Sequence, residues 1–227
     1  MCPIVIAVLG DSLSLPLKRD MRYREALIDA RDMLVPYRDT FPALMQMLFG
    51  QALGTPVLIA SQTQRGATTV ELLELALTAL REYQPHYSIV NIGTSDARFR
   101  PTGLRRVGGT LWQKVALPEF ERNLSRLLPA LAFSRTVPIT IGILPCSTEL
   151  LRKYPDTARE FARYNAVLKR FTVAAGGIFL DMNDLAECID EYVAPDGFHY
   201  SGKTHWHVAH RILETIQQDL SSRRSGG

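Results

Sequence analysis

The chain has 227 residues, of which 46% are hydrophobic and 22% are charged, and its formal net charge is only +3. A chain of this length and composition can bury one substantial core and is typical of a single soluble domain. The small net charge gives no argument for a nucleic-acid partner, and no stretch approaches the roughly 18 apolar residues of a membrane-spanning helix. We therefore predict neither nucleic-acid binding nor membrane insertion, and composition leaves the oligomeric state open.

The predicted elements alternate along the chain between short β-branched runs and longer amphipathic stretches. Strands are predicted at residues 4–9, 57–60, 88–92, 137–143 and 177–181, and helices at 41–52, 69–82, 118–133, 156–174 and 201–220. Such alternation predicts a parallel sheet covered by helices on both faces. The fold class is therefore α/β, a three-layer α/β/α sandwich with a five-stranded parallel sheet.

One domain is predicted over residues 1–220, followed by a disordered tail at 221–227. The charged run at 18–39 is predicted as a surface helix, with a lid or substrate loop as the alternative. Cys2, Cys146 and Cys188 are widely spaced and odd in number, which favours reduced thiols over a disulfide framework. Because the start of the chain also lacks the pattern of a signal peptide, a cytoplasmic location is predicted.

Polar clusters follow several of the predicted strands. Ser12 stands in Gly10-Asp11-Ser12-Leu13, where the first strand ends, so its hydroxyl should project from the carboxyl edge of the sheet. Far downstream, Asp196 and His199 are three positions apart, close enough for one turn to aim both at the same hydroxyl. A nucleophile, a base and an orienting acid are therefore all present.

Two further clusters, Gln64-Arg65-Gly66-Ala67-Thr68-Thr69 and Gly93-Thr94-Ser95-Asp96, follow the second and third strands. With the clusters at Ser12 and His199 they make four blocks in an order that resembles the SGNH (GDSL) hydrolase family over nearly the whole chain. The resemblance implies a flavodoxin-like fold, a catalytic triad of Ser12, His199 and Asp196, and an oxyanion hole. The family's oxyanion donors correspond here to the Ser12 and Gly66 N–H groups and to Ser95, which stands where the family has asparagine.

The expected activity is hydrolysis of an O-acyl ester through an acyl-enzyme formed on Ser12. Three alternatives remain open at this point. The chain could be a thioesterase or lysophospholipase, an acyltransferase that uses the same acyl-enzyme but excludes water, or a non-catalytic binding protein of the same fold. The last alternative follows from the missing asparagine.

Asp11, Asp96, Arg98 and Arg100 are the predicted substrate-binding residues. The spacing Asp96-x-x-x-Arg100 is similar to a divergent SGNH-like branch associated with bacterial polysaccharide and glycan biosynthesis, which implies an ester carried on a sugar. Together with Arg105 and Arg106, these guanidinium groups could clamp an anionic substrate, although a solvated basic loop is the simpler interpretation.

Three histidines, His205, His207 and His210, raise a metal hypothesis that their spacing does not favour, because it does not place all three on one helical face. Gly108-Gly109 lacks the strand and helix of a dinucleotide-binding loop, and no phosphate-binding loop pattern occurs. We therefore predict no metal and no cofactor.

Overall fold

The computed structural model describes residues 3–18, 33–97, 99–100, 112–113 and 115–225. Its central sheet is parallel and has five strands in the order β4-β1-β5-β8-β9. The strands are β1 (Ile4–Gly10), β4 (Val57–Thr63), β5 (Tyr87–Asn91), β8 (Val137–Ile141) and β9 (Ile178–Leu180). The three strands β1, β5 and β8 are covered on both faces, which explains why they read as almost continuous β-branched and aliphatic runs.

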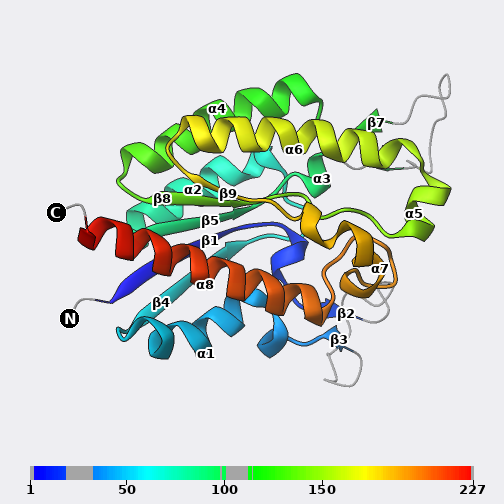
Figure 1. Ribbon diagram of the computed structural model, residues 1–227. Coiled ribbons are helices and arrows are strands. Elements are labelled where there is room, and N and C mark those ends of the chain that lie inside the picture. The colour runs from blue at the N-terminus through cyan, green and yellow to red at the C-terminus, as the bar shows by residue number, and fades with distance from the viewer. Residues whose placement is uncertain (1–2, 19–32, 98, 101–111, 114, 226–227) are drawn as a thin grey trace.

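Helices cover both faces of this sheet, which confirms the predicted three-layer sandwich (Figure 1). One layer contains α1 (Phe41–Leu53) and α8 (Gly202–Ser225), and the other contains α2 (Thr69–Tyr83), α4 (Leu117–Phe133) and α6 (Asp156–Ala174). Two buried clusters fill the space between the layers, one on each side of the sheet. The core is therefore split by the sheet, and the strand ends are left to carry polar groups.

Shorter elements gather at the carboxyl end of the sheet, on the right of the view in Figure 1 and opposite both termini. They include the helices α3 (Thr94–Ala97), α5 (Thr148–Lys153) and α7 (Ile189–Tyr192). The 3-10 helices are η1 (Ser12–Ser14), η3 (Tyr37–Asp39) and η4 (Asn183–Cys188). Two small antiparallel pairs join β2 (Leu17–Lys18) to β3 (Met33–Val35) and β6 (Phe99–Arg100) to β7 (Trp112–Gln113).

The structure corrects two predictions about local structure. The described ends of the run at 18–39 form strands and a 3-10 turn, so these ends are not part of a surface helix, and residues 19–32 lie outside the described part. Helix α8 also continues through Ser225, so most of the expected disordered tail is helical. An ion pair of 2.8 Å between Arg223 and Asp219, one turn apart, supports this last part of the helix.

Candidate active site

The nucleophile turn begins where β1 ends, between two neighbouring strands. Gly10 is paired with Asn91 of β5 and with Thr63 of β4. A Cβ atom on Gly10 would stand 2.7 Å from the Asn91 carbonyl oxygen and 2.9 Å from the Ser14 hydroxyl, so only glycine fits there. This close approach lets the chain turn directly into η1 and brings Ser12 to the edge of the sheet.

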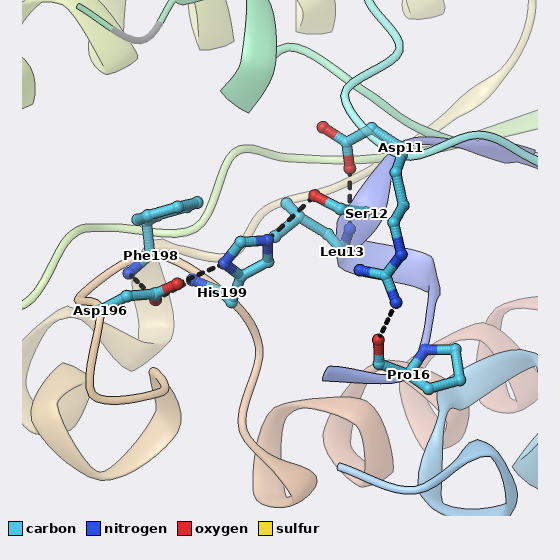
Figure 2. Close-up of polar contacts among 8 residues, drawn as sticks. Asp11, Ser12, Leu13, Pro16, Asp196, Phe198 and His199 are labelled. Atoms are coloured by element: carbon cyan, nitrogen blue, oxygen red, sulfur yellow. Dashed lines mark hydrogen bonds and ion pairs between the residues drawn. The ribbon is translucent and has the colours of Figure 1, made fainter. Parts of the chain in front are cut away.

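Asp11 holds this turn in shape. Its Oδ1 accepts a hydrogen bond of 2.9 Å from the Leu13 N–H, and its Oδ2 accepts one of 2.8 Å from the Ser95 hydroxyl (Figure 2 shows the first). Asp11 is only 1% exposed. A buried carboxylate that caps a turn in this way restricts the backbone on both sides of Ser12.

The three residues predicted as a catalytic triad lie in one hydrogen-bonded row. Ser12 Oγ is 2.9 Å from His199 Nε2, and His199 Nδ1 is 2.5 Å from Asp196 Oδ2 (Figure 2). Because an ionised carboxylate can only accept, Nδ1 carries the imidazole proton and donates it to Asp196. The lone pair of Nε2 is then directed at the Ser12 hydroxyl, as a general base requires.

Asp196 also organises the backbone of its own turn. Its Oδ1 accepts hydrogen bonds from the N–H groups of His199, at 3.0 Å, and of Phe198, at 3.3 Å. Burial alone would raise the pKa of Asp196, but the hydrogen bond and charge of His199, together with the two backbone N–H donors, outweigh it and lower the pKa. The carboxylate therefore stays ionised in the range where His199 acts as a base.

The loop that carries Gly66 is fastened to the nucleophile turn. Arg65 donates a hydrogen bond of 2.6 Å to the carbonyl oxygen of Pro16, and the Gln64 N–H donates one of 3.0 Å to the Gly10 oxygen. Gly66 has φ +70°, a left-handed conformation that favours glycine. The predicted oxyanion residue thus lies in a turn held against Ser12, just before the capping box that starts α2 at Thr68.

Ser95 is brought to the site, but its hydroxyl points to Asp11. A serine hydroxyl has a single proton, and the 2.8 Å hydrogen bond to Asp11 Oδ2 uses it. The predicted role as third oxyanion donor would require the hydroxyl to leave this carboxylate. In this arrangement Ser95 supports the Asp11 cap of the nucleophile turn instead.

Replacing Ser95 by alanine tests this interpretation. Loss of a true oxyanion donor lowers kcat by about 10² to 10³, whereas loss of a support for Asp11 should lower it less than about tenfold. Steady-state kinetics of Ser95→Ala on an activated aryl ester would measure the loss, with the parent chain as reference. A loss of 100-fold or more with KM unchanged would return Ser95 to the oxyanion hole.

The remaining predicted substrate-binding residues are not shown at the site. Asp96 is fully buried, and its Oδ1 accepts from the Thr69 N–H at 2.9 Å and from the Thr69 hydroxyl at 2.7 Å, so it joins α3 to the start of α2. Asp11 is likewise buried and serves the turn. These contacts replace the expected substrate contacts of both carboxylates. Arg98, Arg105 and Arg106 lie outside the described residues, and Arg100 is described only as part of β6.

The three histidines of α8 have separate surroundings. His205 accepts a hydrogen bond of 3.1 Å from the Phe41 N–H at Nδ1, and burial, assisted by nearby His199, lowers its pKa to about 3. His210 stacks on Trp206, and His207 lies 3.5 Å from Asp184. Within the described ranges, no group of three or more His, Cys, Asp or Glu side chains could hold a metal ion. No helix among the same residues is long and apolar enough to cross a membrane.

A cavity of about 370 Å³ lies beside the site, between α6, the end of β9 and the segment that follows β8. Its lining is mainly apolar and includes Phe161, Phe179 and Cys146. It is joined to the Asp196 turn through the neighbouring Ser147, whose N–H donates to the Gly197 oxygen at 2.9 Å. None of the predicted site residues lines it.

Sequence reasoning missed a buried polar group close to the nucleophile. Asn91 ends β5, is 2% exposed and forms hydrogen bonds with Ser14 and Tyr200. Its position as the only polar residue but one in the strand Tyr-Ser-Ile-Val-Asn was the available signal. A buried amide at a strand end needs partners, which points to neighbouring polar groups.

Known proteins share both the motifs and the fold. The model of the GDSL-like lipase/acylhydrolase family matches residues 8–207. A comparison with curated protein sequences finds no match. With the sheet, the flanking helices and the Ser12–His199–Asp196 row, this match defines a serine hydrolase of the SGNH type. The chain belongs to the GDSL-like lipase/acylhydrolase family.

Similar solved structures come from several bacteria. The psychrotrophic esterase EstA from Pseudoalteromonas sp. is 16% identical with a TM-score of 0.63, over 96% of this chain and 98% of that chain. The acetylxylan esterase Axe2 from Geobacillus stearothermophilus is 18% identical with a TM-score of 0.65, over 94% of each chain. A lipase/acylhydrolase from Enterococcus faecalis is 17% identical with a TM-score of 0.66, over 95% of this chain and 96% of that chain. At these identities the likeness shows a shared fold.

Proposed function

We propose that this protein is an esterase that hydrolyses an O-acyl ester through a covalent acyl-enzyme on Ser12. The observation that carries the proposal is the hydrogen-bonded row from Ser12 Oγ to His199 Nε2 and from His199 Nδ1 to Asp196. A serine hydroxyl is a weak nucleophile unless a base stands within hydrogen-bond reach, and here one does.

In the first half of the reaction, Ser12 Oγ attacks the ester carbonyl while His199 Nε2 takes the hydroxyl proton. Asp196 stabilises the imidazolium that forms, because its carboxylate faces the Nδ1 proton. The tetrahedral intermediate then collapses, the proton on Nε2 passes to the leaving alcohol oxygen, and the acyl group remains on Ser12.

In the second half, water enters where the alcohol left. His199 takes a proton from the water, the resulting hydroxide attacks the acyl carbonyl, and the proton returns to Ser12 Oγ as the acid is released. The backbone N–H groups of Ser12 and Gly66 are the proposed donors to the oxyanion in both halves. The hydrogen bonds that fasten the Gly66 turn to Gly10 and Pro16 support this role.

The proposed substrate is a small or carbohydrate-linked ester. The likeness to Axe2, which is described as an acetylxylan esterase, supports a carbohydrate ester as the first substrate to examine. The four arginines that follow the Gly93 block support an anionic group on the substrate. Neither of the cysteines that the structure describes, Cys146 and Cys188, forms a disulfide, which is compatible with the proposed cytoplasmic location.

A fluorophosphonate probe tests the proposed function directly. The probe phosphonylates a serine only when a base activates that serine, so the parent chain should gain one adduct and lose its esterase activity in step. Mass spectrometry of the digested protein should place the adduct on the peptide that contains Ser12. An adduct on another serine, or full activity after complete labelling of Ser12, would contradict the proposal.

Substrate charge gives a separate prediction. If Arg98 and Arg100 contact the substrate, an anionic ester should have a higher kcat/KM than its neutral isostere, and rising salt should reduce the advantage. Arg100→Ala should remove part of it, and Arg100→Lys should not restore a bidentate contact. Kinetics of both esters at low and moderate ionic strength measure the ratio. An equal ratio in all three proteins would indicate a solvated basic loop.

A further inference from the structure

A buried chain of hydrogen bonds runs behind the triad. The Tyr200 hydroxyl donates a hydrogen bond of 3.1 Å to Asn91 Oδ1, and Asn91 Nδ2 donates one of 3.1 Å to Ser14 Oγ. The exposed fractions of Tyr200, Asn91 and Ser14 are 1%, 2% and 2%. These groups are therefore shielded from water, and each depends on the others for its hydrogen bonds.

This chain joins the two elements that must meet for catalysis. Ser14 ends η1, the short helix that begins at Ser12, and Tyr200 follows His199 directly in the sequence. Asn91 stands between them at the end of β5, where its backbone is paired with Gly10. One buried amide thus contacts both the nucleophile turn and the segment that carries the base.

The direction of each hydrogen bond is set by chemistry. Burial, together with the nearby negative charge of Asp11, raises the pKa of Tyr200 far above its ordinary value, so the phenol keeps its proton and is a permanent donor. The Asn91 carbonyl oxygen must therefore face Tyr200, and its amide nitrogen must face Ser14. The two ends of the amide cannot exchange places without losing both hydrogen bonds.

Few other contacts fix the distance between Ser12 and His199. These residues are 187 positions apart, and the turn at Asp196 is held mainly by hydrogen bonds within itself, including the one from the Ala194 N–H to the His199 oxygen. Asp11 and Ser95 restrain the nucleophile side alone. The amide of Asn91 is the element that relates one side to the other.

We propose that Tyr200, Asn91 and Ser14 are positioning residues that hold Ser12 Oγ and His199 Nε2 at reacting distance. The inference rests on the proposed function, because it assumes that Ser12 and His199 are nucleophile and base. None of the three touches the substrate. They act through the placement of the two groups that do.

Tyr200→Phe is the sharpest variant, because it removes one oxygen and keeps the ring that packs in the core. A displacement of about 1 Å at a reacting pair can cost about 100-fold, so we expect phosphonylation of Ser12 and kcat on an aryl ester to fall about 10- to 100-fold, with KM nearly unchanged. A crystal structure of the variant should show Ser12 Oγ and His199 Nε2 farther apart than 2.9 Å.

Tyr87→Phe is the matched control. Tyr87 begins the same strand that Asn91 ends, is also buried, and donates a hydrogen bond of 2.7 Å to Asp219, far along the strand from Ser12. Both variants lose a buried hydroxyl contact and should lower the melting temperature. Only Tyr200→Phe should slow phosphonylation, whereas Tyr87→Phe should label within about twofold of the parent.

Ser14→Ala breaks the other end of the chain. Because both ends act through the same amide, the rate loss in the double variant Ser14→Ala with Tyr200→Phe should be smaller than the product of the two single losses. Equal labelling rates for Tyr200→Phe and the parent, or equal slowing in Tyr200→Phe and Tyr87→Phe, would overturn the positioning role. Failure of the parent itself to label at Ser12 would instead overturn the proposed function.

Discussion

Replacement of Ser12 by alanine is expected to lower kcat/KM on an aryl ester by about 10⁴- to 10⁶-fold, because it removes the atom that forms the acyl-enzyme. The folded structure should survive, since Ser12 is half-buried and the turn is held by the Asp11 cap and by Ser14 rather than by the Ser12 hydroxyl. Steady-state kinetics and thermal unfolding of the purified variant measure the two effects separately.

His199→Ala supplies the partner experiment. Nucleophile and base act as one unit, so His199→Ala alone and the double variant with Ser12→Ala should lose about as much activity as Ser12→Ala alone, within about tenfold. Ser201→Ala is a suitable control, because its hydroxyl is at the surface of the same segment and bonds only weakly to the Glu191 oxygen, at 3.4 Å. Full activity in Ser12→Ala would remove Ser12 from the mechanism.

Replacement of Asp196 by asparagine is expected to lower kcat by about 10⁴-fold while leaving the shape of the site almost unchanged. An amide NH₂ facing Nδ1 would force the imidazole to carry its proton on Nε2, the atom that must accept from Ser12. The loss should fall on kcat rather than KM, and the rate of phosphonylation at Ser12 should fall with it. Unchanged phosphonylation would show that Asp196 does not set the tautomer.

The same variant has an expected effect on acid stability. The pKa of Asp196 is lower in the folded chain than its ordinary value of 3.8, so the unfolded state binds the proton more readily. The stabilisation is present in full above the unfolded pKa and is lost as the pH falls through the lower folded pKa. The difference in free energy of unfolding between the parent and Asp196→Asn should therefore be constant above about pH 5 and shrink below about pH 4. A difference that stays constant across this range would contradict the lowered pKa.

The sequence alone determined the fold class and most of its elements. The predicted strand at 88–92 and the helix at 156–174 agree with β5 and α6 to within one residue. The prediction succeeded because these segments are long, periodic and bounded by turn residues, so their pattern depends on local structure and burial alone. The short elements α3, α5 and α7 were not predicted, since helices of six residues or fewer are stabilised by tertiary contacts rather than by their own periodicity.

For the site, the sequence supplied Ser12, Asp196 and His199 as candidates through motif and spacing, but it could not relate groups that are far apart in the chain. Only the tertiary structure brought Ser95 to Asp11 and Asp96 to Thr69, and so turned two expected substrate or oxyanion contacts into supports for the backbone. The same is true of Asn91 between Ser14 and Tyr200. Spacing predicts which side chains share a turn, whereas the direction of a hydroxyl or an amide depends on partners that only the packed sheet edge brings within 3 Å or so.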